Sequence, residues 1–297
     1  MNVVSLFGGI ECGRIALDRE NIIVDKYYSS EICKDAIEVA DGNYNDIIQL
    51  GDVTKWEEWD IDWSSIDLLL AGFPCQSWSL AGKQKGLSDE RGQLVYSMTG
   101  ILSRIKSLNP DIIFLFENVK MKPEYLELLN EEIGVYPLRI NSKLLSAGLR
   151  DRYYWTNIKG VEQPKDLGLK LADILESGKT DREKSLCIIK RYEGFSGSQS
   201  YLRRRYFGKS MGQAVFEYCE PTDQKEMWKL DDRKEYPKEQ GTIRSLTTLE
   251  CERIQTLPEG YVSNVIGDNM KAKGIIGNGW TVDVIVHIFK GLSKPTE

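Results

Sequence analysis

The chain has 297 residues, 41% of them hydrophobic and 28% charged, which is enough for one large α/β domain with a small lobe. No run approaches the roughly eighteen consecutive apolar residues of a transmembrane helix, so no membrane span is expected. The six cysteines are scattered without a Cys-x-x-Cys pair, and His287 is the single histidine. Disulfide frameworks, metal clusters and Ser-His-Asp catalysis are therefore not expected.

The first residues read directly as a strand, over residues 3–7, that runs into Gly8 and Gly9. A charged segment followed by an apolar run and a small-residue cleavage site, as in a signal peptide, does not precede it. This beginning favours a cytoplasmic protein.

From residue 1 to about residue 158, short apolar runs alternate with amphipathic segments of helical length. The alternation predicts a parallel sheet with helices on both faces. The expected strands are residues 3–7, 23–29, 66–71, 111–116 and 152–158, and the expected helices are residues 11–19, 34–40, 94–107 and 123–131.

Beyond Gly160 the sequence becomes richer in glycine, serine, tyrosine and charge, and its periodicity weakens. We interpret this part as a small, irregular lobe. Thr247 and Glu250 then have the spacing of a capping box that opens a helix over residues 249–256, which stops at Pro258. Residues 280–289 suit a buried helix or strand. The predicted domains are therefore residues 1–159, 160–241 and 242–297, the last returning to the first.

Acidic residues follow the first strands at the positions of nucleotide-binding side chains. Gly8 and Gly9 allow a ligand to approach the backbone closely, although a tight structural turn is an equally good interpretation. Glu31 ends the next strand about 20 residues later, where an acidic side chain commonly binds ribose hydroxyls. Asp52 follows the Ile47-Ile48 run and could bind an adenine amino group. The three strand ends predict a nucleotide-sized crevice.

Cys75 follows the apolar strand at residues 66–71, at an edge of the sheet where ligands bind. The alternative is an inert buried cysteine, which is common for this residue type. The loop continues through residues 82–92, which are basic and contain glycines at both ends. Such a segment is typical of a lid.

Two further segments carry charge to the sheet. Glu117 ends the apolar run at residues 114–116, and an ordinary carboxylate at a strand end is the alternative. Arg150 and Arg152 are two residues apart, so on an extended segment they point the same way. The alternative for the arginines is a surface ion-pair face.

In their order and spacing, these motifs resemble those of the cytosine-5 methyltransferase family across nearly the whole chain. The resemblance rests on FPCQSWSLAGKQKGLSDERGQL, ENV, RDR and GNGWTVDVIVHIF, in family order. The chain looks most similar to the catalytic domains of animal de novo DNA methyltransferases, without their chromatin-reading modules, as in a stand-alone bacterial or phage enzyme. It implies a Rossmann-like, S-adenosylmethionine-dependent methyltransferase sheet with a small target-recognition lobe. Ser5 stands where many members carry an aspartate, and the lobe matches no pattern.

The resemblance also implies a mechanism. The Cys75 thiolate adds to carbon 6 of a cytosine flipped out of the double helix, and Glu117 protonates ring nitrogen 3. Carbon 5 then becomes nucleophilic toward the methyl group of S-adenosylmethionine. Arg152, with Arg150 behind it, stabilises the negative charge on the base.

The implied binding residues fall into two groups, and no metal site or membrane partner is implied. The partner is double-stranded DNA, and the cofactor is S-adenosylmethionine. The expected cofactor contacts are Phe7, Gly8, Gly9, Glu31, Ile32, Asp52, Val53, Pro74, Asn278 and Trp280. The expected DNA contacts are Gln76, Ser79, Lys83, Arg91, Arg203, Arg204 and Arg205.

The expected DNA contacts in the lobe rest on charge. Residues 182–209 contain eight basic side chains and only two acidic ones, Glu183 and Glu193, in a protein of net charge −6. A solvated loop is the alternative interpretation.

Three other functions remain open at this point. A transfer-RNA cytosine methyltransferase shares the catalytic motifs, although the Cys-Phe-Thr signature of that subgroup is absent. A DNA-binding homologue that has lost its chemistry would not be expected to keep Cys75, Glu117 and Arg152. A small-molecule methylase would not explain the lid and the basic lobe.

Overall fold

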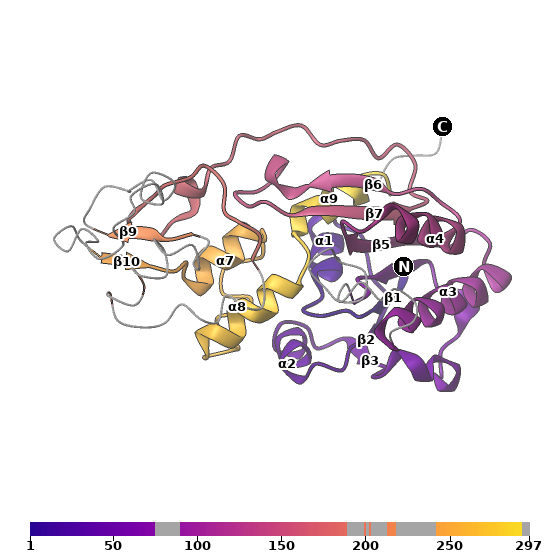
Figure 1. The fold of residues 1–297 in the computed structure, drawn as a ribbon. Helices are drawn as coiled ribbons and strands as arrows, with labels where there is room; N and C mark the ends of the chain where they lie inside the picture. Colours follow the sequence, from indigo (N-terminus) through magenta and orange to yellow (C-terminus); the bar gives the residue numbers. More distant parts are fainter. Residues whose placement is uncertain (75–89, 189–198, 200–201, 203–212, 218–241, 293–297) are drawn as a thin grey trace. The chain divides into compact units, whose positions relative to one another are not determined.

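A computed structural model describes residues 1–74, 90–188, 199, 202, 213–217 and 242–292 (Figure 1). The chain forms two compact units, each described here by itself. The first comprises residues 1–141, 151–164 and 282–297, and the second comprises residues 142–150 and 165–281. Within the part of the chain that the structure describes, none of the helices is long and apolar enough to cross a membrane.

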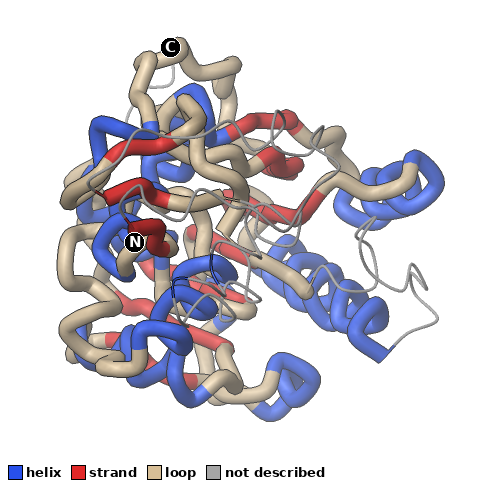
Figure 2. The backbone as a smooth tube through the Cα atoms, turned by 60° about the vertical axis from the view of Figure 1, so that its left-hand side comes forward, coloured by secondary structure: helices blue, strands red, loops and turns tan. Residues whose placement is uncertain are grey.

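A seven-stranded sheet organises the first unit, and its strands are drawn in red in Figure 2. The strand order is β3-β2-β1-β4-β5-β7-β6. In chain order the strands are β1 (Asn2–Leu6), β2 (Lys26–Ser30), β3 (Ile47–Gln49), β4 (Leu68–Ala71), β5 (Ile113–Val119), β6 (Leu138–Asn141) and β7 (Asp151–Thr156).

The predicted parallel sheet is correct for β1 to β5 and wrong for β7. Strands β1 to β5 pair in parallel, but β7 runs antiparallel to both β5 and β6. Only residues 142–150 join β6 to β7, and a parallel crossover needs about a dozen residues or more. The strand expected at residues 23–29 begins at Lys26, because Asn21 turns in the left-handed region and Ile23 is exposed.

Buried helices cover the sheet, as predicted. The bounds are α1 (Cys12–Arg19), α2 (Lys34–Asn43), α3 (Glu90–Leu108), α4 (Pro123–Ile133) and α9 (Val282–Phe289). Apolar residues of α3 and α4 pack with Leu6, Leu69 and Phe116 in one core. The last segment, left open as helix or strand, is helix α9, which packs on α1. Arg19 and Asp283 join these two helices by an ion pair of 2.6 Å. Short 3-10 helices η1 (Val53–Glu58) and η2 (Trp63–Ser65) precede β4.

The second unit contains a small antiparallel sheet and two longer helices. Its sheet has the order β10-β9-β8. The elements are η4 (Ser142–Leu144), η5 (Leu171–Ile174), β8 (Lys179–Thr180), β9 (Val215–Glu217), β10 (Thr242–Arg244), α7 (Thr248–Ile254) and α8 (Asn269–Asn278). The predicted capping box is confirmed, because Thr247 Oγ1 accepts from Glu250 N at 3.0 Å and Glu250 Oε2 accepts from Thr247 N at 2.8 Å.

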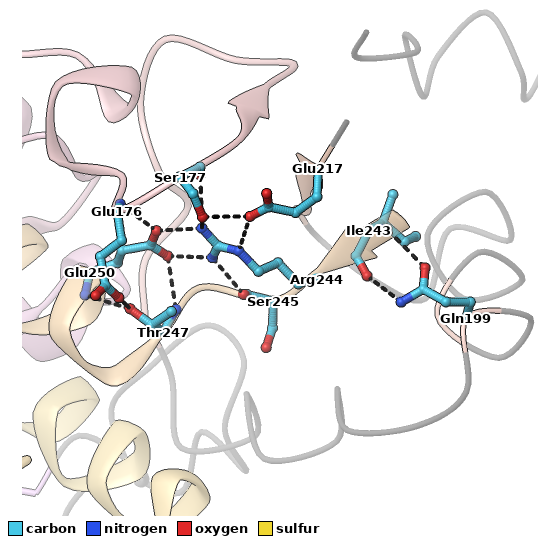
Figure 3. Close-up of polar contacts among 9 residues, drawn as sticks. All are labelled: Glu176, Ser177, Gln199, Glu217, Ile243, Arg244, Ser245, Thr247 and Glu250. Atoms are coloured by element: carbon cyan, nitrogen blue, oxygen red, sulfur yellow. Dashed lines mark hydrogen bonds and ion pairs between the residues drawn. The ribbon is translucent and has the colours of Figure 1, made fainter. Parts of the chain in front are cut away.

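Arg244 ties the small sheet to α7 (Figure 3). Its Nε lies 2.7 Å from Glu217 Oε1 on β9, and its Nη2 lies 2.7 Å from Glu250 Oε1 on α7. Nη2 also donates to Ser177 O at 2.8 Å. The Glu250 carboxylate is fully buried, so this arginine supplies the positive charge that its burial requires. The predicted domains were drawn from composition and periodicity, and that division stays a prediction.

Candidate active site and cofactor site

The carboxyl ends of five parallel strands lie at one edge of the large sheet. The chain runs outward from β1 to β3 and then crosses to β4 on the other side of β1, so the strand order reverses between β1 and β4. Ligands of open α/β sheets bind at such a reversal. The predicted residues that follow these strand ends are Phe7, Gly8, Gly9, Glu31, Ile32, Asp52, Val53 and Pro74.

The turn after β1 has a conformation that favours glycine. Phe7 and Gly9 both lie in the left-handed region, with φ of 55° and 58°. A Cβ atom on Gly8 would lie 2.0 Å from Glu11 Oε1, so a larger residue would not fit there. Gly9 N donates to Glu31 Oε2 at 2.9 Å, which joins this turn to the end of β2.

Glu31 is held in place by three backbone amides. Besides Gly9, the amides of Ile32 and Cys33 donate to Oε1 at 2.7 and 2.8 Å. An ionised carboxylate accepts about four hydrogen bonds, so one more donor, such as a ribose hydroxyl, can be accommodated. The Ile32 side chain is 72% exposed, so its apolar surface is available to a bound ligand.

Asp52 caps η1 with one of its two carboxylate oxygens. Oδ1 accepts from Thr54 N at 2.9 Å and from Thr54 Oγ1 at 2.8 Å. The backbone hydrogen bond and then the hydroxyl lower the pKa of Asp52, which keeps it ionised and able to accept from an amino group. Val53, the other predicted contact here, is buried.

The structure also contains a buried acid that was not among the predicted site residues. Glu11 is fully buried, and its carboxyl group accepts from Tyr27 Oη at 2.7 Å and from Ser29 Oγ. Burial raises the pKa of Glu11 to about 7, although these hydroxyl groups oppose the shift. The signal in the sequence was an acidic residue directly after the glycine turn, flanked by Ile10 and Cys12.

Glu117 and Arg152 form an ion pair at the same sheet edge. Glu117 is opposite Tyr154 in the β5–β7 register, and Arg152 is two residues before Tyr154, so both side chains lie on one face. Arg152 Nε lies 2.7 Å from Glu117 Oε1, and both side chains are largely buried. Because the parallel register pairs Phe116 with the last residue of β4, Glu117 stands level with the loop that leads to Cys75.

Arg150 precedes the strand that carries Arg152. The strand β7 begins at Asp151, so the alternation of side chains along that strand does not include Arg150. Arg150 is buried in the second unit, where its Nη1 donates to Gly277 O at 3.1 Å. Its catalytic role stays a prediction.

Asn118, next to Glu117 in the ENV tripeptide, was not predicted as a site residue. Its buried Nδ2 donates to Phe73 O at 3.1 Å. This bond ties the end of β5 to the backbone two residues before Cys75. A side chain that fixes the approach to a nucleophile can be recognised only when the neighbouring strand is known.

Several predicted residues lie outside what the structure describes. These are Cys75, Gln76, Ser79, Lys83, Arg203, Arg204 and Arg205. Arg91 lies in α3, but its side chain is not described either.

Asn278 and Trp280 belong to the second unit, at the end of α8 and just after it. Gln255 holds this turn, because its Nε2 donates to Gly279 O at 3.1 Å and its Oε1 accepts from Thr281 Oγ1 at 2.7 Å. The cofactor role of Asn278 and Trp280 stays a prediction.

The basic side chains that the structure describes within residues 182–209 bond to other groups of this chain. Arg182 pairs with Asp181 at 2.7 Å. The Lys184 ammonium donates to the carbonyl oxygens of Lys143 at 2.6 Å and Ser146 at 2.9 Å, and to that of Leu169. Lys184 therefore joins separate segments of the second unit, and any excess charge for DNA rests on the rest of the run.

The comparisons with known proteins agree with this arrangement. A model of the family described as C-5 cytosine-specific DNA methylase matches residues 1–132 and 152–294. The Type II methyltransferase M.DsaV of Dactylococcopsis salina is 30% identical, over 96% of this chain and 84% of that protein. M.NgoBV of Neisseria gonorrhoeae, also a Type II methyltransferase, is 31% identical over 67% of this chain, which spans about half (51%) of that relative.

A solved methyltransferase structure has a similar fold. The crystal structure of the S. pombe Dnmt2 methyltransferase has a TM-score of 0.67 at 17% identity and covers 99% of this chain and 100% of that one, a likeness that shows the fold alone. The sheet is thus that of the S-adenosylmethionine-dependent methyltransferases. With the family model matching most of its length, this chain belongs to the C-5 cytosine-specific DNA methylase family, and it is a DNA cytosine-5 methyltransferase with S-adenosylmethionine as its methyl donor.

Proposed function

We propose that Cys75, Glu117 and Arg152 methylate carbon 5 of a cytosine flipped out of duplex DNA, through a covalent adduct with Cys75. The observation that supports this best is the Glu117–Arg152 pair at the carboxyl edge of the sheet, with Asn118 bonded to the backbone just before Cys75. A carboxyl group and a guanidinium at one place can bind the two polar edges of a cytosine ring.

The chemistry proceeds in three steps on the base. The Cys75 thiolate adds to carbon 6 while Glu117 donates a proton to nitrogen 3, and carbon 5 becomes nucleophilic. Once carbon 5 carries the methyl group, a base removes the carbon-5 proton, the Cys75 sulfur leaves, and nitrogen 3 returns its proton to Glu117. Arg152 holds the Glu117 carboxyl group in place and faces the charge that develops on the ring.

The residues at the strand ends fit the methyl donor. Gly8 has no room for a side chain, and the carboxylates of Glu31 and Asp52 are each fixed with acceptor capacity remaining. We assign Phe7, Gly8, Gly9, Glu31, Ile32, Asp52, Val53 and Pro74 to this site, and we also propose Asn278 and Trp280 as cofactor contacts. When bound, S-adenosylmethionine supplies an electrophilic methyl group on a sulfonium.

The DNA contacts are assigned to two segments. Gln76, Ser79, Lys83 and Arg91 would occupy the space that the flipped base leaves, and Arg203, Arg204 and Arg205 would contact phosphates or a base edge. The relatives named above are Type II methyltransferases, which supports a role for this chain in restriction–modification.

Bisulfite sequencing of plasmid DNA from cells that express the protein tests this proposal. We expect 5-methylcytosine within one short sequence context for the wild type and none for Cys75→Ser. Purified protein should also transfer labelled methyl groups to duplex DNA in preference to transfer RNA. A preference for transfer RNA, or substantial methylation by Cys75→Ser, would contradict the proposal.

A further inference from the structure

Glu11 lies at the end of the turn that is assigned to the cofactor, as the residue before helix α1. It is fully buried, and its backbone lies in the left-handed region with φ of 57°. Such a conformation is uncommon for a residue other than glycine and persists only where the surroundings impose it. Glu11 N donates to Gly8 O at 3.0 Å, so its main chain closes the turn.

Its side chain is held by hydroxyl groups from two neighbouring strands. Ser29 Oγ bonds to Oε1, Tyr27 Oη bonds to Oε2 at 2.7 Å, and Ser5 also forms a side-chain hydrogen bond to this carboxyl group. Ser5 and Ser29 are directly opposite one another in the β1–β2 register and are both buried. Three hydroxyl groups from β1 and β2 therefore converge on one carboxyl group.

The same carboxyl group fills the space beside Gly8. The position of a Cβ atom on Gly8 is 2.0 Å from Glu11 Oε1 and 2.7 Å from Ser29 Oγ. Gly8 N donates to Ser30 O at 3.2 Å, and Gly9 N donates to the Glu31 carboxylate at 2.9 Å. The turn is thus packed from one side by Glu11 and bonded from the other by the end of β2.

We propose that Glu11 is a positioning residue for methyl-donor binding: its carboxyl group, held by Ser5, Ser29 and Tyr27, fixes Gly8 and Gly9 in the conformation that receives the cofactor. The inference rests on the proposed placement of the cofactor at this turn. Glu11 itself lies behind the turn, so its effect on the donor is transmitted through the two glycines.

Because Glu11 can ionise, its effect on the turn depends on pH. Burial raises its pKa to about 7, and the neighbouring Glu31 acts in the same direction. Tyr27 bonds to it from β2, and the guanidinium of Arg14, on the helix that Glu11 precedes, lies 5.6 Å from the Tyr27 ring centre. Arg14 is itself paired with Asp18 and Asp46, which balance its charge. Above neutral pH an ionised Glu11 would repel Glu31 and loosen the turn.

Calorimetry with S-adenosylmethionine, without DNA, tests this inference on four proteins between pH 6 and 8.5. Glu11→Ala, which empties the space beside Gly8, should weaken binding at least about tenfold at pH 6. Glu11→Gln keeps the volume and cannot ionise, so it should bind within about threefold of wild type at pH 6. Glu38→Gln, at an exposed position on α2, is the matched control and should behave as wild type.

The ratio of wild-type to Glu11→Gln dissociation constants cancels the titration of the ligand, and it should rise severalfold through about pH 7. A merely structural role would leave this ratio constant. A constant or falling ratio would overturn the proposal, and so would a Glu11→Ala protein that binds S-adenosylmethionine as tightly as wild type. If Glu11→Ala does not fold, the Glu11→Gln ratio still decides.

Glu31→Ala and Asp52→Ala, measured alongside, separate this outcome from an error in the site. If both bind the donor as wild type, the cofactor site is misplaced. If both bind weakly while the Glu11 variants behave as wild type, the site stands and only the role of Glu11 is wrong.

Discussion

Asn118 donates a hydrogen bond from its buried Nδ2 to the carbonyl oxygen of Phe73, at 3.1 Å, and so joins the strand that carries Glu117 to the backbone that leads into Cys75. The two groups proposed for the chemistry are therefore linked by a single side chain. Asn118 Oδ1 is also used, because it accepts from Val119 N at 2.7 Å.

We expect Asn118→Asp to lower kcat about tenfold to a hundredfold, since it removes a donor to a buried carbonyl, which typically costs about 1–3 kcal/mol. The KM for S-adenosylmethionine should change little. Asn157→Asp is a matched control, because Asn157 Nδ2 makes the same kind of bond to Ile112 O, at 2.8 Å, before the start of β5. Equal kcat losses in the two variants would indicate general destabilisation instead of positioning.

Glu117→Gln tests the proposed proton donor. A glutamine keeps the shape of the side chain but cannot protonate nitrogen 3, so kcat should fall about a hundredfold to ten-thousandfold. Affinity for the methyl donor should stay near the wild-type value in calorimetry. A variant that turns over within tenfold of wild type would leave Glu117 with a structural role beside Arg152 only.

The sequence was sufficient to predict most of the large sheet, because β1, β4 and β5 each contain a short buried apolar run of the kind that a doubly covered sheet requires. It was not sufficient for β6, a short strand in which only Ile140 is buried. Nor did it predict α8, whose interior glycines lower its helical propensity; Gly277 is needed because its Cβ would meet Ile188 O at 3.1 Å.

The residues of the candidate site were also only partly predictable from the sequence. Residues at the carboxyl ends of strands were predictable from the parallel sheet alone: Glu31 directly follows β2, and Glu117 lies within the last three residues of β5. Glu11 and Asn118 depend on partners from other strands, Ser29 and Phe73, that no local pattern brings together.

Arg203, Arg204 and Arg205 lie outside the described residues, and their role can be tested by salt dependence. If they contact phosphates, each alanine variant should weaken DNA binding equally across sequences and flatten the salt slope by about one unit. If one reads a guanine, its loss should cost about 1–3 kcal/mol at one base position. Arg182, already paired with Asp181, serves as the comparison, and its alanine variant should keep the wild-type slope. Wild-type slopes and specificity in all three variants would exclude this segment from DNA binding.

Arg244→Met should destabilise the second unit strongly. It keeps an apolar stem in place of the arginine stem but removes the cation that pairs with the fully buried Glu250 carboxylate, and removing one partner of a buried pair typically costs about 3–5 kcal/mol. Urea unfolding should show this loss. The double variant Arg244→Met, Glu250→Gln should recover much of it, because the buried charge is gone. A single variant as stable as wild type would show that the pair contributes little.

The raised pKa of Glu11 also predicts how stability depends on pH. Below about pH 4.5 the carboxyl group is protonated in both the folded and the unfolded chain, so it has no effect. Between 4.5 and about 7 the unfolded chain releases its proton and the folded chain does not, so the free energy of unfolding falls as pH rises. Above about 7 the full penalty of about 3 kcal/mol is present.

Glu11→Gln lacks this titration. The difference in unfolding free energy, wild type minus Glu11→Gln, should therefore decrease by about 3 kcal/mol from pH 4.5 to 7 and then level off. Urea titrations at several pH values measure it, with Glu38→Gln as the control for removal of an exposed carboxylate. A difference that does not change with pH would mean that Glu11 titrates in the folded protein as it does in the unfolded chain.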